Sequence, residues 1–572
     1  MSRARGAPSA RVAPSVGAPA GRASAPPRRG PRKARVFALA MALVFCAMAL
    51  WSAATPLYAA PDEPVQAAKA AAVVRGELAG ARYSPQVKAL GLVHVPAFFA
   101  LPANRNDPTC YHRQPTIPAS CAPRLVDAGN ALTPSWIYVA RYPPLYYAIV
   151  GLPSLFGSGP LTVYLMRLVA ALLSAVFIAL AVMSAVVWSK RRLLLAGVLV
   201  ATTPMVLFLG GVVNPSGLEV AAAISVWTSG TLLVTEHLHD PPPGLVAVLG
   251  GSAAVFELVR ALSPFWLALI ALALVGIADR RGLAALFRRR QARWALAGVA
   301  LVGVVAVAWI LGEHATDVYS RSPLGPAPET TILETSFAHN DFYLQGMIGV
   351  FGWFDTFSPT FTYVAWYGLV GLLGLMAAIV ARARQVLVLV VLTAAIVVVP
   401  VAISSSQVHR YGYTWSGRDT LPLAVGLPLV AAALIASSDL ARHGRRLVAG
   451  AGLVAFLAQF AAFFEALRRY GVGTRGPDFG FVLRASWSPP TGFVFLLVAE
   501  AVVLALLCAG AAAVVPRPAF ARGAHAAGRR AEAEQDAPER GEKGAVVLGE
   551  DGRETEVEPG AAPLSAPTGP SQ

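Results

Sequence analysis

The sequence predicts an all-α integral membrane protein. The chain has 572 residues, of which 56% are hydrophobic and only 14% are charged, and its mean hydropathy is +0.58. Soluble globular domains carry roughly 25% charged residues, so this composition is too apolar for that class. Apolar runs recur from residue 36 to residue 515, and many are long enough to cross the hydrocarbon core of a bilayer as helices. Residues 36–515 are therefore expected to form one polytopic membrane domain.

The distribution of charge predicts the orientation of this domain and limits its partners. The formal net charge is +16, but the basic residues gather in the N-terminal tail and in short turns between apolar runs, which is the positive-inside pattern. Such turns are also expected to attract anionic membrane lipids. The sequence has no compact basic domain and no base-stacking motif, so we expect no nucleic-acid partner. The polar segments 1–35 and 516–572 are predicted to be disordered cytoplasmic tails.

The apolar runs, assigned to alternating sides by the charge rule, give about twelve membrane spans with both termini in the cytoplasm. The first run is interpreted as a retained anchor. The alternative is a cleaved signal peptide, but the run is long for one and follows a long tail. The expected spans are residues 36–55, 161–188, 193–212, 217–235, 244–259, 264–279, 294–312, 361–381, 385–403, 420–437, 447–466 and 491–515.

Two long segments between spans are expected outside the cell. The first external loop covers residues 56–160, and the second is the acidic segment 313–360. Within the first loop, residues 65–75 and 143–156 are predicted to form two short amphipathic helices that lie on the membrane surface.

The four cysteines fall into two pairs by environment. Cys46 and Cys508 lie in apolar runs and are expected to be inert packing residues. Cys110 and Cys121 lie in the first external loop, where an oxidising compartment favours a disulfide between them. Two unpaired thiols in that loop are the alternative.

Two adjacent carboxylates, Asp62 and Glu63, are the strongest candidates for chemistry because they directly follow the first apolar run. One interpretation is structural: Pro64 suits the first turn of a helix, and an acidic residue before it caps free N–H groups. The other is catalytic, because a carboxylate at the membrane face can remove a proton from an acceptor hydroxyl or hold a divalent cation against a phosphate. The pattern leaves both interpretations and the use of a metal open.

A second group of candidates combines basic and aromatic side chains in the external segments. Guanidinium groups bind phosphate oxygens through paired hydrogen bonds, and neighbouring rings can pack on a sugar or a lipid tail. The alternative is an interfacial belt of aromatic residues with arginines that extend to the water. The candidates for substrate binding are Arg141, Tyr142, His409, Arg410 and Arg418, the last three in an expected loop at 404–419.

Five motifs in a fixed order resemble a known family. The sequence has no Walker loop, HExxH or GxSxG pattern, so nucleotide-driven soluble chemistry is unsupported. Over roughly residues 36–440, the chain resembles an uncharacterised family of bacterial multi-pass membrane proteins that is grouped with the GT-C glycosyltransferases. The motifs are P-D-E-P at 61–64, R-Y-P-P-L-Y-Y at 141–147, V-N-P-S-G-L at 213–218, G-W-F-D-T at 352–356 and S-G-R-D-T-L-P-L at 416–423.

The resemblance implies a function and places some residues in it. GT-C enzymes transfer a sugar from a polyprenyl-phosphate carrier, so the implied partners are a lipid-linked sugar donor and a glycan or lipid acceptor in the bacterial cell envelope. It puts Asp62 and Glu63 at the catalytic position, and Arg418 near the end of an external span. The chain departs from the family pattern at Gln66, where a histidine is common, and at Asp419, where an aromatic residue is common.

Two functions are therefore consistent with the sequence. The first is a glycosyltransferase that uses a polyprenyl-phosphate-linked sugar at the external face of the plasma membrane. The second is a non-enzymatic carrier, flippase or assembly partner for lipid-linked glycans, which would hold the same head group without turnover.

Overall fold

The computed structural model describes residues 33–82, 90–100, 110–125, 127, 129–317, 325 and 327–516. Apart from residues 33–35 and 516, the tails that were expected to be disordered lie outside the described residues.

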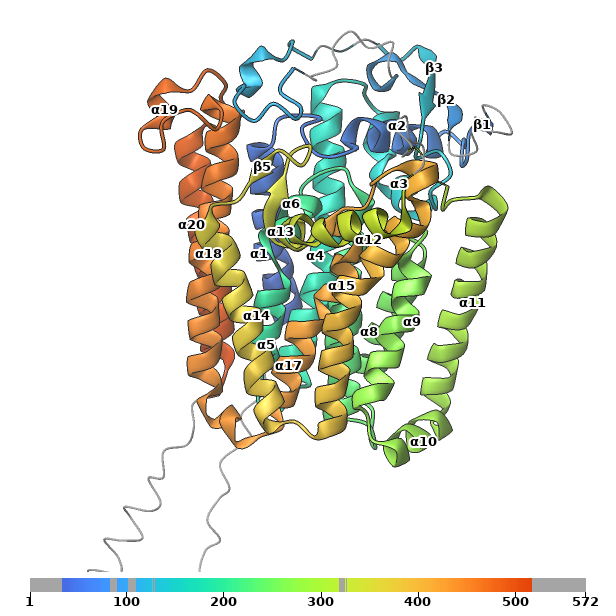
Figure 1. The fold of residues 1–572 in the computed structure, drawn as a ribbon, viewed down its shortest axis with the longest axis vertical. Coiled ribbons are helices and arrows are strands. Elements are labelled where there is room, and N and C mark those ends of the chain that lie inside the picture. The colour runs from blue at the N-terminus through green and yellow to red at the C-terminus, as the bar shows by residue number, and fades with distance from the viewer. Residues whose placement is uncertain are drawn as a thin grey trace, which may run out of the picture. The chain divides into compact units, whose positions relative to one another are not determined.

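Long helices packed side by side form most of this structure (Figure 1). Among the described residues, nine helices are long and apolar enough to cross a membrane, which confirms the expected all-α membrane fold. The nine are α1 (Lys33–Ala54), α4 (Pro160–Val187), α7 (Pro215–Glu236), α11 (Arg290–Glu313), α14 (Thr360–Val380), α15 (Ala383–Tyr411), the consecutive pair α16 (Gly417–Ala424) and α17 (Gly426–Ala436), α18 (Gly444–Val472) with the 3-10 turn η4 (Asp439–His443) before it, and α20 (Phe493–Val514).

The expected number of twelve spans is not confirmed. The other three expected spans are present as helices, but α8 (Pro243–Glu257) and α9 (Ser263–Ile277) have only 15 residues each, or about 22 Å of length, which is short of a bilayer core. The third is divided into α5 (Leu194–Ala201) and α6 (Pro204–Gly210). The break has a local cause, because Pro204 has no N–H to continue the helix and Thr203 caps the new one by accepting from the N–H of Val206.

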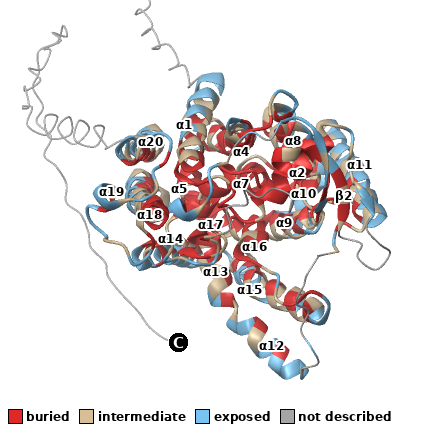
Figure 2. Ribbon diagram, turned by 90° about the horizontal axis from the view of Figure 1, so that it is seen from above, coloured by how far each residue is buried: buried red, intermediate tan, exposed pale blue. Residues whose placement is uncertain are grey.

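Burial separates a central helix from the peripheral ones. Helix α7 is buried along almost its whole length and lies in the middle of the bundle (Figure 2). In contrast, α11, α14 and α15 expose many leucine and valine side chains. An apolar surface of this extent needs an apolar environment, and the bilayer supplies it.

Connecting segments gather at one end of the bundle, which we call the loop face (Figure 1). It carries a three-stranded antiparallel sheet made of β1 (Ala81–Arg82), β2 (Gly91–Pro96) and β3 (Leu132–Ile137), in that order. Two short helices from the same segment, α2 (Glu63–Val73) and α3 (Leu145–Val150), pack against each other there.

The two short helices differ in part from the sequence expectation. Every residue of α2 is buried, so this helix lies inside the loop face and not on the membrane surface. Helix α3 and the 3-10 turn η3 (Leu152–Leu155) occupy the second expected segment, and there Leu152, Leu155 and Phe156 are exposed. Only the second segment therefore offers apolar side chains to the outside of the protein.

A second set of elements at the loop face follows α11. Helices α12 (Glu329–Ala338) and α13 (Asn340–Gly349) lead into a hairpin of β4 (Val350–Phe351) and β5 (Thr356–Phe357). The disulfide expected between Cys110 and Cys121 is present. Arg469 of α18 joins the disulfide segment to the hairpin: it donates to the carbonyls of Tyr111 and Ile117, both at 2.8 Å, and to the carboxylate of Asp355 at 3.2 Å.

One buried ion pair connects the start of this layer to the bundle. Arg167 of α4 and Glu63 at the start of α2 have no exposed side-chain surface and are joined by two hydrogen bonds, of 2.7 and 2.5 Å. Arg167 also donates to the carbonyls of Ser52, Thr55 and Pro56, at the end of α1 and just beyond it. The ion pair thereby fixes the chain between α1 and α2, where Asp62 lies.

We predict that Arg167→Met strongly destabilises the protein, because it leaves the carboxylate of Glu63 buried without its cation. The expected loss in the free energy of unfolding is about 3–5 kcal/mol, measured as a fall in the thermal-unfolding midpoint of the detergent-purified protein. Arg410→Met is the matched control, since Arg410 is 67% exposed and 3.8 Å from Asp317, a surface pair worth about 0–1 kcal/mol. Equal effects of the two substitutions would contradict the prediction.

Candidate functional site

Asp62 lies in the connection between α1 and α2 with its side chain turned away from the helix that it precedes. Its backbone is in the left-handed region, with φ 62° and ψ 2°, and its side chain makes no capping hydrogen bond to α2. Aspartate adopts this backbone region more readily than most residues. The side chain of Asp62 therefore does not cap α2.

The carboxylate of Asp62 instead meets side chains from two distant segments. The hydroxyl of Tyr138, just after β3, donates to Oδ1 at 2.7 Å. The guanidinium of Arg418, in the first turn of α16, donates through Nη2 to Oδ2. Asp62 keeps 23% of its side chain exposed. The structure therefore brings together Asp62 and Arg418, and it leaves the carboxylate accessible.

Tyr138 was not identified from the sequence, and its role here is that of a donor. Burial, followed by the charge on Asp62, raises the pKa of Tyr138 well above its usual value. Its hydroxyl consequently stays protonated and holds one oxygen of Asp62 in place. No motif in the sequence links residue 138 to residue 62, so this contact could be found only in three dimensions.

Arg418 has hydrogen-bonding capacity to spare. Its Nε and Nη1 atoms are buried and have no partner within the described part of the chain, although the side chain is 13% exposed at another point. The ring of Phe354 lies 5.5 Å from the guanidinium carbon. A buried donor without an acceptor costs about 1–3 kcal/mol, so an anion that accepts from either atom would stabilise this site.

A second arginine fixes the element that carries Arg418. Arg260, between α8 and α9, donates to Asp419 at 2.8 Å and to Glu219 of α7 at 3.2 Å. Burial acts to lower the pKa of Arg260, but the charges of Glu219 and Asp419 outweigh it and raise that pKa. Asp419 also accepts from the N–H and the hydroxyl of Ser416, which closes the first turn of α16. The aspartate that departs from the family pattern thus anchors Arg418.

Glu63 does not share the site with Asp62. Besides the two bonds from Arg167, it accepts from the N–H groups of Tyr58 and Val213, both at 3.0 Å. It is 0% exposed and its oxygens are fully occupied, so the structure does not support the expectation of a catalytic Glu63. The side chains of adjacent residues project in different directions. Here the carboxylate of Glu63 is buried and structural, whereas that of Asp62 remains accessible.

Arg141 and Tyr142 have different surroundings. Arg141 is buried and donates from Nη1 to Glu313 of α11 at 2.6 Å, and its carbonyl accepts from the indole of Trp309 at 3.1 Å. It therefore holds the loop-face end of α11. Burial raises the pKa of Tyr142; the charge of Arg260 acts against this, and the charge of Asp62 adds to it.

His409 and Arg410 were expected in a loop, and this expectation was wrong. Helix α15 continues through Tyr411, which leaves a connection of only residues 412–416 before α16. Both side chains are exposed on the last turn of α15, and Arg410 contacts Asp317. Neither residue contacts Asp62 or Arg418 in the described structure.

The donor set around Asp62 does not favour a protein-held cation. Both oxygens of Asp62 already accept hydrogen bonds, and the described residues contain no group of three or more His, Cys, Asp and Glu side chains that could hold a metal ion.

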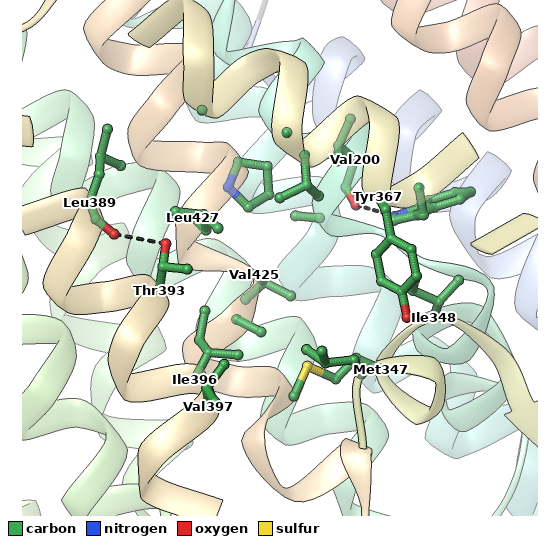
Figure 3. A pocket seen from close by; sticks show the side chains of 18 of the residues that line it. Val200, Met347, Ile348, Tyr367, Leu389, Thr393, Ile396, Val397, Val425 and Leu427 are labelled. Atoms are coloured by element: carbon green, nitrogen blue, oxygen red, sulfur yellow. Dashed lines mark hydrogen bonds between the residues drawn. The ribbon is translucent and has the colours of Figure 1, made fainter. Parts of the chain in front are cut away.

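A large apolar pocket lies one helical turn from Arg418. Its volume is about 870 Å³, and side chains of α5, α13, α14, α15, α16 and α17 line it (Figure 3). Two of its polar atoms are already satisfied, because Thr393 donates to the carbonyl of Leu389 and Trp366 donates to that of Val200. The pocket therefore offers hydrocarbon contacts and almost no free polar atoms.

The pocket is open beside two peripheral helices. Leu375 of α14 and Val390 and Val398 of α15 line it and are 58–62% exposed. The next turn of α16 brings Leu421 into the lining, three residues after Arg418. Phe342 and Gly346 of α13 lie beside Arg418, whereas Leu344 and Met347 of the same helix line the apolar pocket. Helices α13 and α16 thus contribute residues both to the surroundings of the Arg418 guanidinium and to the apolar pocket.

The family model of predicted membrane proteins named DUF2142 matches residues 45–427. The chain belongs to this family. The match includes Asp62, Tyr138 and Arg418, and so covers the whole candidate site. A comparison with curated proteins finds no match.

Two crystal structures are distantly similar. ArnT from Cupriavidus metallidurans in the apo state is 16% identical, with a TM-score of 0.35, and the similarity covers 70% of this chain and 71% of that one. ArnT from the same organism bound to undecaprenyl phosphate is 15% identical, with a TM-score of 0.38 and coverage of 88% and 80%. These likenesses concern the fold alone.

The loop face also contains a buried lysine whose titration is expected to make stability depend on pH. Lys69 of α2 is fully buried and donates to the carbonyls of Leu78 and Ala140. Burial, with a further contribution from Arg141, lowers the pKa of Lys69 to about 7. The folded protein therefore releases this proton near neutrality, whereas the unfolded chain keeps it until about pH 10.

We predict that stability rises between about pH 7 and pH 10, because the unfolded state binds the additional proton there, by at most about 1.4 kcal/mol per pH unit. The thermal midpoint of the wild type should increase from pH 7 to pH 9, and Lys69→Met should remove that increase. Lys190→Met, at an exposed lysine, should keep it. An unchanged slope in Lys69→Met would refute the assignment.

Proposed function

We propose that this protein transfers a sugar from a polyprenyl-phosphate carrier to an acceptor at the external face of the bacterial plasma membrane, with both termini in the cytoplasm. The observation that carries the proposal is Arg418, which pairs with an accessible Asp62 through one nitrogen and keeps two buried nitrogens unpartnered. Phosphate is a common acceptor of charge-assisted hydrogen bonds from guanidinium groups in proteins.

The proposed chemistry is a direct displacement. An acceptor hydroxyl attacks the anomeric carbon of the donor sugar, the bond from that carbon to the phosphate oxygen breaks, and the carrier phosphate leaves with one more negative charge. Asp62 takes the proton of the attacking hydroxyl as general base. Arg418 stabilises the charge that develops on the leaving phosphate, an effect typically worth several kcal/mol.

Arg418 can serve both partners at the same time. Its Nη2 remains with Asp62, while Nε and Nη1 are free for phosphate oxygens. Tyr138 holds the other oxygen of Asp62, so the carboxylate keeps its direction while the substrate binds. Fixed donors and acceptors of this kind lower the reorganisation that a reaction requires.

The apolar pocket supports a lipid as the carrier. One turn of α-helix rises about 5.4 Å, so a phosphate at Arg418 lies about one turn from Leu421 in the pocket lining. The exposed residues of α14 and α15 beside the pocket would let a hydrocarbon tail enter from the bilayer. The alternative function, a non-enzymatic carrier, flippase or assembly partner, uses the same arginine and pocket but does not need Asp62.

We predict that Asp62→Asn abolishes sugar transfer and preserves binding of the carrier. Loss of a general base typically costs a factor of about 10²–10⁴ in rate. The measurement is transfer of radiolabelled sugar in membranes supplied with a pool of polyprenyl-linked sugars from the source cells. Full transfer by Asp62→Asn would remove Asp62 from the mechanism, and carrier binding by the wild type without any turnover would favour the non-enzymatic alternative.

We also predict that filling the apolar pocket weakens carrier binding. Gly371 of α14 lines the pocket, and a side chain added there meets open space. Gly371→Leu should lower the affinity for undecaprenyl phosphate at least tenfold, measured by native mass spectrometry of the purified protein. Gly368→Leu is the matched control, because Gly368 lies one turn away in the same helix, also with open space, but outside the pocket lining. Equal binding by both variants would place the carrier elsewhere.

A further inference from the structure

A second pocket at the loop face is built from residues that the proposed function does not use. Its volume is about 660 Å³, and it lies between the β4–β5 hairpin, the disulfide segment and the end of α18. Its lining combines three aromatic rings with charged and polar groups. The residues that matter here are Trp353, Phe354, Phe357, Arg113 and Glu465.

We infer that this hairpin pocket binds the acceptor, and that the acceptor is an acidic saccharide that arrives from the aqueous side. This inference rests on the proposed function and adds the chemical class of its second substrate. The aromatic rings would pack against the apolar faces of sugar rings, and the charged groups would bind their substituents.

The hairpin places the rings through an unusual backbone. Gly352 and Phe354 both have positive φ, of 63° and 62°. A Cβ at Gly352 would collide with the side chain of Asp355, and a phenylalanine rarely adopts this backbone region. The G-W-F-D-T motif therefore has a structural explanation: the glycine permits the turn, and the two aromatic residues after it face the pocket.

The charges of the pocket are neutralised except for one. Glu465 accepts from Nε and Nη2 of Arg468, at 2.7 and 2.6 Å, and Asp355 accepts from Arg469. The N–H of Arg113 donates to Asp355 at 2.9 Å, which fixes its backbone. Its guanidinium has no hydrogen bond or ion pair among the described residues and is exposed. An acidic group on the ligand is the complement of this free cation.

Two residues of the hairpin connect the pocket to the candidate site. Phe354 lines the hairpin pocket and also lies 5.5 Å from the guanidinium of Arg418. The indole of Trp353 donates at 3.2 Å to the carbonyl of Tyr58, four residues before Asp62. A saccharide in the hairpin pocket would therefore lie next to the general base, on a surface separate from the apolar pocket that would take the lipid.

The test is a binding measurement that needs no turnover. Fluorescently labelled protein in lipid nanodiscs is applied to an array of bacterial saccharides that includes acidic and neutral members. We expect retention on acidic saccharides, and at least a tenfold loss of signal in Arg113→Asn and in Phe357→Ala. Asparagine is chosen because it tolerates the positive φ of 54° at Arg113, and Phe357 is 45% exposed, so both variants should fold.

Matched controls exist on the same face of the protein. Arg475 and Phe479 are exposed and do not line the pocket, so Arg475→Asn and Phe479→Ala should bind like the wild type. The inference is overturned if the wild type is retained by no saccharide on the array, or if the control variants lose as much signal as the pocket variants.

The same preparation separates this inference from the proposed function. If undecaprenyl phosphate binds and transfer depends on Asp62, but no saccharide is retained, only the hairpin pocket is wrongly assigned. If saccharides bind through Arg113 and Phe357 while undecaprenyl phosphate does not bind, the pocket stands and the lipid-dependent transfer fails.

Discussion

The buried ion pair between Glu63 and Arg167 is the constraint on which the candidate site depends. It joins the segment after α1, the start of α2 and the middle of the bundle through a single carboxylate and a single guanidinium. With Glu63 fixed inward, the preceding residue adopts a left-handed backbone and turns outward. Two neighbouring acids therefore have opposite functions: Glu63 determines where the chain lies, and Asp62 remains accessible at the surface that this placement creates.

A comparison with Arg260 shows what Arg418 leaves available for an anion. Arg260 lies between two carboxylates, Glu219 and Asp419, and its charge is compensated within the protein. Arg418 has one carboxylate partner, Asp62, and two buried nitrogens without acceptors. Buried charges without full compensation are costly and are retained where they bind something. Arg260 is thus a structural group that holds α16 in place, whereas Arg418 is held by α16 with two nitrogens available to a ligand.

The sequence predicted the membrane fold well, because long apolar runs have few alternatives in a chain of this composition. It also singled out Asp62 and Arg418, because a motif placed each of them at the end of a span, and the structure brings these two residues into contact. It failed at Glu63, because sequence proximity does not show which way a side chain projects, and at His409 and Arg410, because the polar end of α15 resembles a loop. The contacts of Tyr138 with Asp62 and of Phe354 with Arg418 could not be predicted, since each joins segments that lie several elements apart along the chain.

The most direct test of the central claim is an electron cryomicroscopy structure of the wild-type protein in nanodiscs with undecaprenyl phosphate. The predicted result is phosphate density within hydrogen-bonding distance of Nε or Nη1 of Arg418. This density should be continuous with hydrocarbon density in the apolar pocket beside α14 and α15. Lipid density at another surface, with Arg418 still bonded to Asp62 alone and its other nitrogens unoccupied, would contradict it.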